Sequence, residues 1–220
     1  MMPDVMILCG GKGERLRTVI SDRPKPLAEV QGRPFLDILI DGLSSFDFRR
    51  FILLAGYQGD QIKEYAIQKK QNSSLHFECI IEQFPLGTAG ALRNAVHLIN
   101  TRSVVVLNGD SFCPVDYSKL FSFHKQRSAD MTIVTSFCKE GEDFGSITKA
   151  TDGRIVAFAE KKQKSLTPLI NAGIYLIERS LIETVQINKK VSLEEEAIPF
   201  WISANRHIYA YPASYQHLDI

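Results

Sequence analysis

Short apolar runs alternate with amphipathic segments along the first 138 residues of the chain. The apolar runs are rich in β-branched residues and predict strands over 5–9, 50–56, 76–82, 103–109 and 130–137. Between these runs, apolar positions recur at helical spacing over 35–46, 59–70, 88–99 and 117–127. Strand and helix alternate at least four times, which predicts an α/β protein with a mostly parallel sheet and helices on both of its faces.

The pattern changes after residue 138. Residues 144–161 predict two strands joined by a turn at 151–153. The remaining expected elements are a strand over 169–180, a helix over 191–205 and closing strands over 206–220. No repeat, low-complexity tract or linker separates the two parts, so we expect residues 1–220 to form a single domain.

The composition is that of an ordinary globular protein, with 45% hydrophobic and 23% charged residues. A net charge of +1 gives no overall attraction to nucleic acid or an anionic membrane, so an anionic ligand must be held by a local site. No apolar stretch approaches the roughly 18 residues of a membrane span, and we expect a cytoplasmic protein. The spacing of cysteine and histidine forms no metal motif and favours reduced core thiols at Cys9, Cys79, Cys113 and Cys138.

Three glycines follow the first predicted strand, at Gly10, Gly11 and Gly13. Ligands of open α/β sheets bind at the carboxyl ends of strands, and glycines there let backbone N–H groups approach phosphate oxygens. The spacing excludes a Walker loop, and Leu16 stands where a dinucleotide fingerprint needs glycine. The glycines alone also suit a surface loop with solvated charges.

Basic residues close to the glycines make phosphate binding the better interpretation. Arg15 follows them directly, and Lys25 stands between Pro24 and Pro26. Arginine offers a planar fork for phosphate oxygens and lysine a point charge, while the prolines stiffen the segment that presents Lys25. Such a loop is suited to binding a polyphosphate.

The stretch 10–30, GGKGERLRTVISDRPKPLAEV, resembles the signature of the sugar-1-phosphate nucleotidylyltransferases, which is close to GGxGTRLxPxTxxxPKPLxPV. It departs from that pattern at Glu14, Val19 and Glu29. Further family motifs follow in order at 85–90, 108–110, 144–145, 160–161 and 171–173. The resemblance spans essentially the whole chain and implies a Rossmann-like three-layer nucleotidyltransferase fold with a mostly parallel mixed sheet. It also implies that 1–138 mainly bind the nucleotide and 139–220 mainly the sugar phosphate.

The reaction implied by the resemblance is attack of a sugar 1-phosphate oxygen on the α-phosphorus of a nucleoside triphosphate, giving an NDP-sugar and pyrophosphate. The attacking phosphate is already ionised, so such catalysis is mostly alignment and charge neutralisation. Arg15 would bind the leaving pyrophosphate, and Lys25 would lie near the α-phosphate and the incoming sugar phosphate. The implied nucleotide-binding residues are Leu8, Gly10, Gly11, Gly13, Glu82, Gly87, Thr88, Asn108 and Gly109.

Asp110 follows the buried strand over 103–109, where a carboxylate can hold Mg²⁺ against phosphate oxygens. The other interpretation is a cap for the helix that follows. In the family a second metal carboxylate comes from a W-x-D-x-G-T-type motif, whose beginning is matched by 217–220. The resemblance therefore implies Mg²⁺ as cofactor, with Asp110 and Asp219 as its ligands.

Glu82 lies five residues before Gly87, at the position that faces the base in the family. A carboxylate only accepts hydrogen bonds, and guanine presents two adjacent donors, N1–H and the 2-amino group. Thymine and uracil present one donor between two carbonyls, for which glutamine is the better partner. Glu82 therefore favours GTP, and a solvated glutamate at a strand end is the other interpretation.

For the sugar half, the resemblance implies that Glu160 accepts hydrogen bonds from sugar hydroxyls and that Lys161 binds the sugar-linked phosphate. Lys162 follows where the family often has proline, and strand alternation lets only one of these lysines point inward. Gly145, Asn171 and Gly173 would complete the pocket. Residues 171–173 also suit an ordinary strand bend.

Within the family, Glu82 and the sequences FGSI, FAEK and LINAGIYLI are most similar to the D-glycero-α-D-manno-heptose 1-phosphate guanylyltransferases. Mannose 1-phosphate guanylyltransferases come next, followed by uridylyl and thymidylyl enzymes. The fold also occurs in non-catalytic nucleotide-sensing subunits, which would be expected to lose Arg15, Lys25 or Asp110. All three residues are present, which favours an enzyme.

Overall fold

The computed structural model describes residues 2–11, 23–137, 146–159, 169–213 and 218–219. Its strands are β1 (Asp4–Cys9), β2 (Glu29–Val30), β3 (Arg33–Pro34), β4 (Arg50–Ala55), β5 (His76–Ile81), β6 (Ser103–Asn108), β7 (Ser111–Phe112), β8 (Met131–Phe137), β9 (Ser146–Lys149), β10 (Ile155–Ala159), β11 (Leu169–Glu178), β12 (Ile208–Pro212) and β13 (Leu218–Asp219). Its α-helices are α1 (Phe35–Ser44), α2 (Gly59–Asn72), α3 (Gly87–Asn94), α4 (Tyr117–Gln126), α5 (Arg179–Ile182) and α6 (Ile198–Ser203). Two 3-10 turns and one π-helix complete the list, at Lys25–Leu27, Val96–Leu98 and Leu193–Ala197. Within these described ranges, no helix combines the length and the apolar character needed to cross a bilayer.

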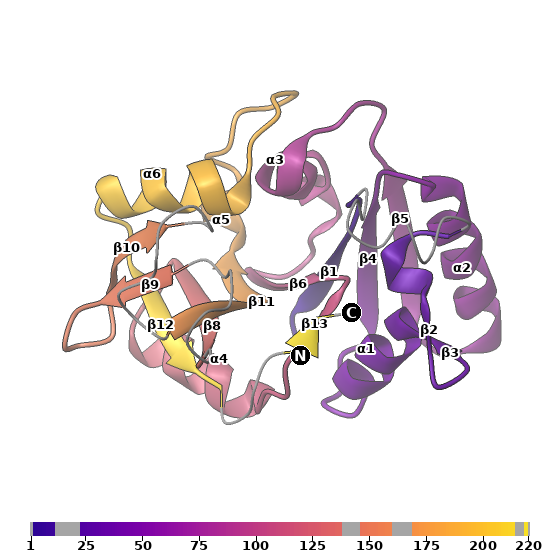
Figure 1. Ribbon diagram of the computed structural model, residues 1–220, viewed down its shortest axis with the longest axis horizontal. Helices are drawn as coiled ribbons and strands as arrows, with labels where there is room; N and C mark the ends of the chain where they lie inside the picture. The colour runs from indigo at the N-terminus through magenta and orange to yellow at the C-terminus, as the bar shows by residue number, and fades with distance from the viewer. Residues whose placement is uncertain (1, 12–22, 138–145, 160–168, 214–217, 220) are drawn as a thin grey trace.

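Nine strands form one central sheet that continues from the first half of the chain into the second (Figure 1). β1 pairs in parallel with β4 and β6, and β4 pairs in parallel with β5. β11 runs antiparallel to β6, β8 and β9, whereas β8 and β12 are parallel. The sheet is mixed with a parallel centre around β1, which confirms the predicted α/β class and its mostly parallel sheet.

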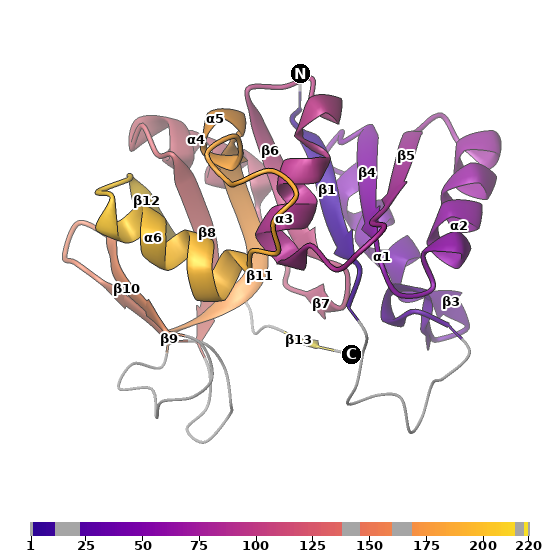
Figure 2. The same ribbon diagram turned by 90° about the horizontal axis from the view of Figure 1, so that it is seen from above.

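Helices cover both faces of this sheet, so the molecule has three layers (Figures 1 and 2). α1, α2 and α4 share one core with Val5 and Ile7 of β1. α3, α5 and α6 share the other core with Met6. Successive side chains of a strand point to opposite faces, which explains why neighbouring residues of β1 belong to different cores.

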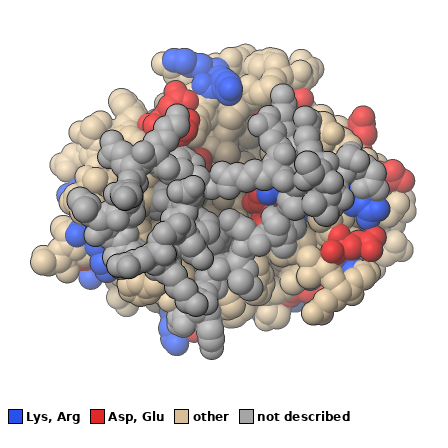
Figure 3. Space-filling model, viewed as in Figure 1, with Lys and Arg blue, Asp and Glu red and all other residues tan. Residues whose placement is uncertain are grey.

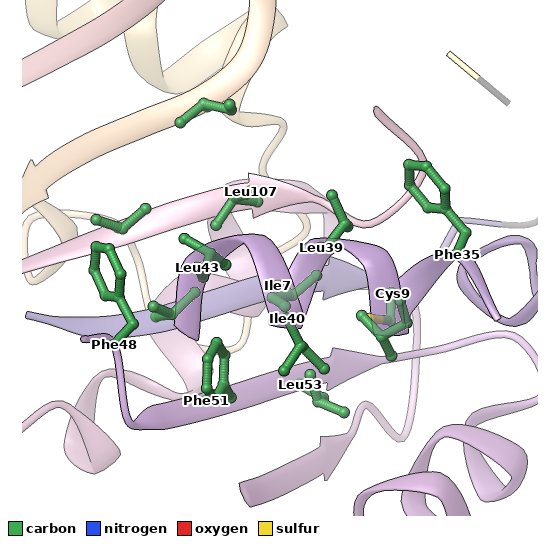
Figure 4. Packing of buried hydrophobic residues seen from close by; sticks show 14 of the residues in the cluster. Ile7, Cys9, Phe35, Leu39, Ile40, Leu43, Phe48, Phe51, Leu53 and Leu107 are labelled. Atoms are coloured by element: carbon green, nitrogen blue, oxygen red, sulfur yellow. The ribbon is translucent and has the colours of Figure 1, made fainter. Parts of the chain in front are cut away.

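The core under α1 holds together the neighbouring strands β1, β4 and β6, of which β1 is followed directly by Gly10 and Gly11 (Figure 4). The apolar positions of α1 recur at helical spacing and form one face of the helix. The side chains packed there from helix and sheet include Ile7, Leu39, Ile40, Leu43, Leu53 and Leu107. Full burial of each such side chain contributes roughly 1.5 to 3 kcal/mol, which makes this a rigid base for the residues beyond the strand ends.

Two expected helices are interrupted. The helix expected over 88–99 is α3 followed by the separate turn Val96–Leu98. The helix expected over 191–205 starts as the π-helix Leu193–Ala197 and continues as α6, with Pro199 in the first turn of α6. Proline has no N–H for the preceding turn and its ring clashes with a carbonyl there, so an unbroken α-helix through Pro199 is disfavoured.

The structure also contains a hairpin that the apolar pattern did not predict. β2 and β3 pair antiparallel on either side of Gln31 and Gly32, whose φ angles are 52° and 77°. Positive φ at both central residues is the geometry of a type I′ turn, which matches the twist of the flanking strands. The hairpin connects the turn that carries Lys25 to the start of α1.

Candidate active site

The candidate site lies at the edge of the sheet where the parallel strands end. The chain runs from β1 outward to β4 and β5, then returns to place β6 on the other side of β1. Ligands of open α/β sheets bind at such a switch point. Gly10 follows β1, and Gly109 and Asp110 follow β6, so the structure brings two of the predicted motifs to this point.

A cavity of about 210 Å³ opens at this edge, beside the ends of β1, β4 and β5. It brings together six residues that the sequence assigned to the nucleotide, namely Leu8, Gly10, Gly11, Glu82, Gly87 and Thr88. Asn94 and Lys190, which no sequence motif indicated, also line it. Apolar walls with a few polar groups are typical of a pocket for a small molecule.

Glu82 is half-buried at the end of β5 and lines this cavity. Its Oε2 atom accepts a hydrogen bond from the backbone N–H of Leu86 at 2.9 Å. A Cβ at Gly56 would lie 2.5 Å from Oε1, so any larger residue there would displace the carboxylate from this position. Burial raises the pKa of Glu82, and the hydrogen bond from Leu86 partly opposes that rise. This carboxylate is therefore held in a cavity wall, unlike a solvated glutamate at a strand end.

The glycines at the start of α3 allow a second chain segment to pack closely against it. Gly87 has a φ of 69°, and a Cβ there would lie 2.5 Å from the carbonyl oxygen of Val191. The same oxygen accepts hydrogen bonds from the N–H groups of Ala89 and Gly90, at 3.0 and 3.2 Å. These bonds satisfy two donors that a helix leaves unpaired at its N-terminus. They also fix the backbone beside Lys190 at the cavity.

Replacing Gly87 by alanine should destabilise the protein by about 2 to 4 kcal/mol, because the new Cβ both strains the backbone and meets the Val191 carbonyl. Gly32 is the matched control, since its φ is 77° and a Cβ there meets nothing within 4 Å. Gly32→Ala should therefore cost only the strain, about 1 to 2 kcal/mol. Urea unfolding measures both losses, and equal losses would contradict the tight contact.

Lys25 and Asp110 meet beside the ends of β1 and β6, although 85 positions separate them in the chain. Nζ of Lys25 lies 3.3 Å from Oδ2 of Asp110. Gly109 permits this approach, because a Cβ there would lie 2.7 Å from the carbonyl oxygen of Leu8 and 3.0 Å from Cγ of Pro26. The structure thus joins the lysine predicted to bind phosphate with the aspartate predicted to bind metal.

The strand that carries Asp219 lies next to the segment that follows Asp110. β13 pairs antiparallel with β7, with Asp219 opposite Ser111. The interpretation of Asp110 as a helix cap is wrong, because α4 is capped by Asp116, which accepts from the N–H of Lys119 at 3.1 Å. Among the side chains that the structure describes, no group of three His, Cys, Asp or Glu forms a ready metal site.

The described sugar-half residues lie on a bulge of β11, where its register against β8 shifts between Asn171 and Tyr175. Gly173 in this bulge has a φ of 69°, and a Cβ there would lie 2.8 Å from Nδ2 of Asn108. Oδ1 of Asn171 accepts from the N–H of Gly173 at 3.0 Å, and Nδ2 donates to the Tyr175 hydroxyl at 2.6 Å. The bend therefore packs the predicted sugar-binding segment against a predicted nucleotide-binding residue.

Neither the overall surface charge nor the cysteine thiols account for binding or chemistry at this site. Lys, Arg, Asp and Glu side chains of both signs are spread over the face drawn in Figure 3, in keeping with the net charge of +1. Cys9, Cys79 and Cys113 are free thiols, and burial raises the pKa of Cys79 and of Cys113 to about 11. These two thiols are protonated at neutral pH and are poor nucleophiles.

Sequence reasoning missed several groups at this site. Gly56 could have been found by the rule that identified Gly10, since it too is a glycine directly after a buried strand. Asn94 and Lys190 in the cavity and Tyr175 in β11 carry no comparable local signal. The predicted site residues that lie outside the described ranges are Gly13, Arg15, Gly145, Glu160 and Lys161.

Comparison with known proteins agrees with this geometry. A family model described as nucleotidyl transferase matches residues 4–215. The chain is 35% identical to a D-glycero-alpha-D-manno-heptose 1-phosphate guanylyltransferase of Aneurinibacillus thermoaerophilus, over 88% of this chain and 82% of that protein. It is 32% identical to a mannose-1-phosphate guanylyltransferase of Mycobacterium tuberculosis, over 96% of this chain but 59% of that protein.

Solved structures give the same result. HddC from Yersinia pseudotuberculosis has a TM-score of 0.87 and 32% identity, with 100% of this chain and 94% of that chain covered. A structure of HddC complexed with GMP-PN has a TM-score of 0.85. Because the family model and a 35% identical relative both cover most of its length, the chain belongs to the nucleotidyl transferase family.

Proposed function

We propose that the protein transfers GMP from GTP to a sugar 1-phosphate, giving a GDP-sugar and pyrophosphate. The observation that carries this proposal is the half-buried Glu82 carboxylate in the wall of the cavity, at the same sheet edge as the Lys25 and Asp110 pair. The relatives from Aneurinibacillus and Mycobacterium are guanylyltransferases, and one HddC structure is complexed with GMP-PN. Both facts support a guanine nucleotide as the donor.

The chemistry requires no nucleophile from the protein. An oxygen of the sugar 1-phosphate forms a bond to the α-phosphorus of GTP while the bond to the bridging oxygen breaks, and pyrophosphate leaves with that electron pair. Lys25 would offset the negative charge of the two phosphates that approach each other. Arg15 would hold the leaving pyrophosphate, and the backbone N–H groups of Gly10, Gly11 and Gly13 would approach the phosphate oxygens.

We further propose that Asp110 and Asp219 hold Mg²⁺. The donor set fits this ion, because carboxylates are preferred ligands of Mg²⁺ and the pairing of β13 with β7 places the backbone of Asp219 opposite Ser111, the residue after Asp110. When bound, the ion would neutralise phosphate charge close to the α-phosphorus. Lys25 already lies against Asp110, so the ammonium group and the ion would share that carboxylate.

The sugar is proposed to be D-glycero-α-D-manno-heptose 1-phosphate, with mannose 1-phosphate as the second candidate and uridylyl or thymidylyl transfer behind both. The relative from Aneurinibacillus supports the heptose, since 82% of its length is matched, whereas 59% of the mannose enzyme is matched. The proposed contacts to the sugar phosphate come from Gly145, Glu160, Lys161, Asn171 and Gly173. GTP and free thiols are both typical of the cytoplasm, where we place the reaction.

The test is a pyrophosphate-release assay that crosses GTP, UTP, dTTP, CTP and ATP with the 1-phosphates of heptose, mannose and glucose. We expect the fastest turnover with GTP and the heptose. Turnover with no pair would support a nucleotide-sensing subunit, the non-enzymatic alternative. The presence of Lys25 and Asp110 in contact argues against that alternative, because a sensing subunit does not need them.

Changing Glu82 to glutamine should reduce the preference for GTP over UTP by about 1 to 3 kcal/mol, or roughly 5- to 150-fold in the ratio of kcat/KM values. The amide replaces one acceptor by a donor, which meets the guanine donors unfavourably and suits uracil better. Glu64→Gln on the exposed side of α2 is the control. An unchanged nucleotide preference in Glu82→Gln would refute the assignment.

Glu82 should also make KM for GTP depend on pH. The raised pKa of Glu82 means that this carboxyl group takes up its proton at higher pH than an ordinary glutamate. Ionised Glu82 accepts both guanine donors above that pKa, and the protonated form below it cannot. KM for GTP should therefore rise as pH falls towards the raised pKa. Glu82→Gln should lack this rise, and a rise of equal size in that variant would exclude Glu82 as its source.

A further inference from the structure

Glu194, at the start of the π-helix Leu193–Ala197, joins the two halves of the candidate site through its carboxylate. Oε2 accepts a hydrogen bond from the hydroxyl of Thr88 at 2.8 Å, and Thr88 lines the nucleotide cavity. Oε1 accepts a hydrogen bond from the hydroxyl of Tyr175 at 2.9 Å, and Tyr175 in turn accepts from Nδ2 of Asn171 at 2.6 Å. A continuous path of hydrogen bonds thus runs from the base cavity to the proposed sugar residue.

Backbone N–H groups at both ends fix the direction of every bond in this path. The N–H of Leu193 donates to the hydroxyl oxygen of Thr88 at 2.6 Å, so the Thr88 proton goes to Glu194. At the other end, the N–H of Gly173 donates to Oδ1 of Asn171 at 3.0 Å, which turns Nδ2 towards Tyr175. Both hydroxyls therefore present a proton to Glu194.

Only a carboxylate satisfies that arrangement. Ionised glutamate accepts on both oxygens, whereas glutamine of the same shape has one oxygen and one NH₂ group. In Glu194→Gln, the NH₂ group would face a hydroxyl whose proton also points at it. Tyr175 has no exposed surface, so weakening the hydrogen bond that its hydroxyl donates to residue 194 is costly.

We propose that Glu194 is a positioning residue, which holds the Asn171 amide in the orientation that receives the sugar 1-phosphate. Thr88 anchors one oxygen of the carboxylate, and Tyr175 transmits the constraint from the other oxygen to Asn171. The bulge places Gly173 directly against Asn108, so a turn of the Asn171 amide would also disturb the contact between the two substrate regions. This inference rests on the proposed function.

The kinetic test compares Glu194→Gln with Glu195→Gln, an exposed neighbour on the same turn. KM for the sugar 1-phosphate should rise about tenfold in Glu194→Gln, while KM for GTP changes by less than about threefold. Tyr175→Phe should give the same rise, because it removes the hydroxyl between Glu194 and Asn171. Equal changes in both KM values, or none, would overturn the proposal.

A double-mutant cycle separates positioning from general loss of structure. If Glu194 acts through Asn171, Glu194→Gln should have no further effect on KM for the sugar 1-phosphate in an Asn171→Ala background. A purely structural role predicts that the effects of the two substitutions on this KM add. It also predicts that Glu194→Gln lowers the active fraction of the enzyme equally in both backgrounds. Additivity would overturn the proposal.

A third measurement does not depend on turnover. The two side-chain amide proton signals of Asn171, assigned by their loss in Asn171→Ser, should be well separated in the wild-type ¹⁵N spectrum because one proton is bonded to Tyr175. Glu194→Gln should bring them together and speed their exchange with water. Unchanged signals would refute the role of Glu194 even if every nucleotide and sugar pair were inactive, whereas wild-type inactivity alone would count only against the proposed function.

Discussion

Replacing Lys25 by methionine should lower kcat/KM by about 10²- to 10³-fold, roughly 2.7 to 4 kcal/mol of transition-state stabilisation. Methionine keeps an aliphatic stem but removes the ammonium group, which lies 3.3 Å from Asp110. The Lys25 side chain is 22% exposed, so its charge acts in a partly desolvated site, where it stabilises phosphate charge more than in water. The proposed attack brings two anionic phosphates together, and that repulsion is what Lys25 would offset.

Pyrophosphate release with GTP and the accepted sugar 1-phosphate measures this loss. Lys70→Met, on the exposed side of α2, is the matched control and should keep full activity. Arg15→Ala should lose a similar amount, because Arg15 is proposed to hold the leaving pyrophosphate. A Lys25→Met enzyme within about threefold of wild-type kcat/KM would contradict the proposed role of Lys25.

Replacing Asp110 by asparagine should lower kcat by about 10³-fold or more, because the change removes a proposed Mg²⁺ ligand charge worth several kcal/mol in the transition state. Asparagine keeps the shape of the side chain and much of its packing beside Gly109. Folding stability should change little, because the Asp110 side chain is 39% exposed and its ion pair with Lys25 is accessible to water.

A binding measurement separates metal loss from other causes of inactivity. Mn²⁺ binding in the presence of a non-hydrolysable GTP analogue, followed by electron paramagnetic resonance, should weaken markedly in Asp110→Asn. Asp116→Ala is the contrasting control, since it removes the side-chain cap of α4 and should cost about 1 kcal/mol of stability while sparing activity. Wild-type affinity for Mn²⁺ in Asp110→Asn would rule out Asp110 as a ligand.

The elements around β1 could be predicted because the pattern of apolar residues within each one shows how that element is buried. The β-branched runs of β1, β4 and β6 and the apolar positions of α1 report burial directly, and these elements agree with the expected ranges to within two residues. The unpredicted features lie where one or two residues decide the backbone, as Pro199 does in the first turn of α6 and Gln31 with Gly32 between β2 and β3.

For the site, the sequence indicated which residues carry the chemistry but not which of them touch. The motif around Gly87 was assigned to the nucleotide, and the structure adds that its glycine is needed for the close approach of Val191. Asp110 had two interpretations, and only the position of Asp116 at the start of α4 excluded the helix cap. Glu82 also had two interpretations, and its place in the cavity wall beside Gly56 argues against a solvated glutamate, while its contact with the base stays a proposal.

By itself, the sequence determined the four parallel strands β1, β4, β5 and β6, the helices α1, α2 and α4, and the glycines and charged residues of the family motifs, since each signal lies within a few neighbouring positions. Only the tertiary structure decided that Lys25 meets Asp110 and that Glu194 meets Thr88, across 85 and 106 positions of chain. The physical reason is that periodicity reports how one element is buried. A hydrogen bond between distant segments depends instead on the order of the strands in the sheet and on how closely glycine lets two backbones approach.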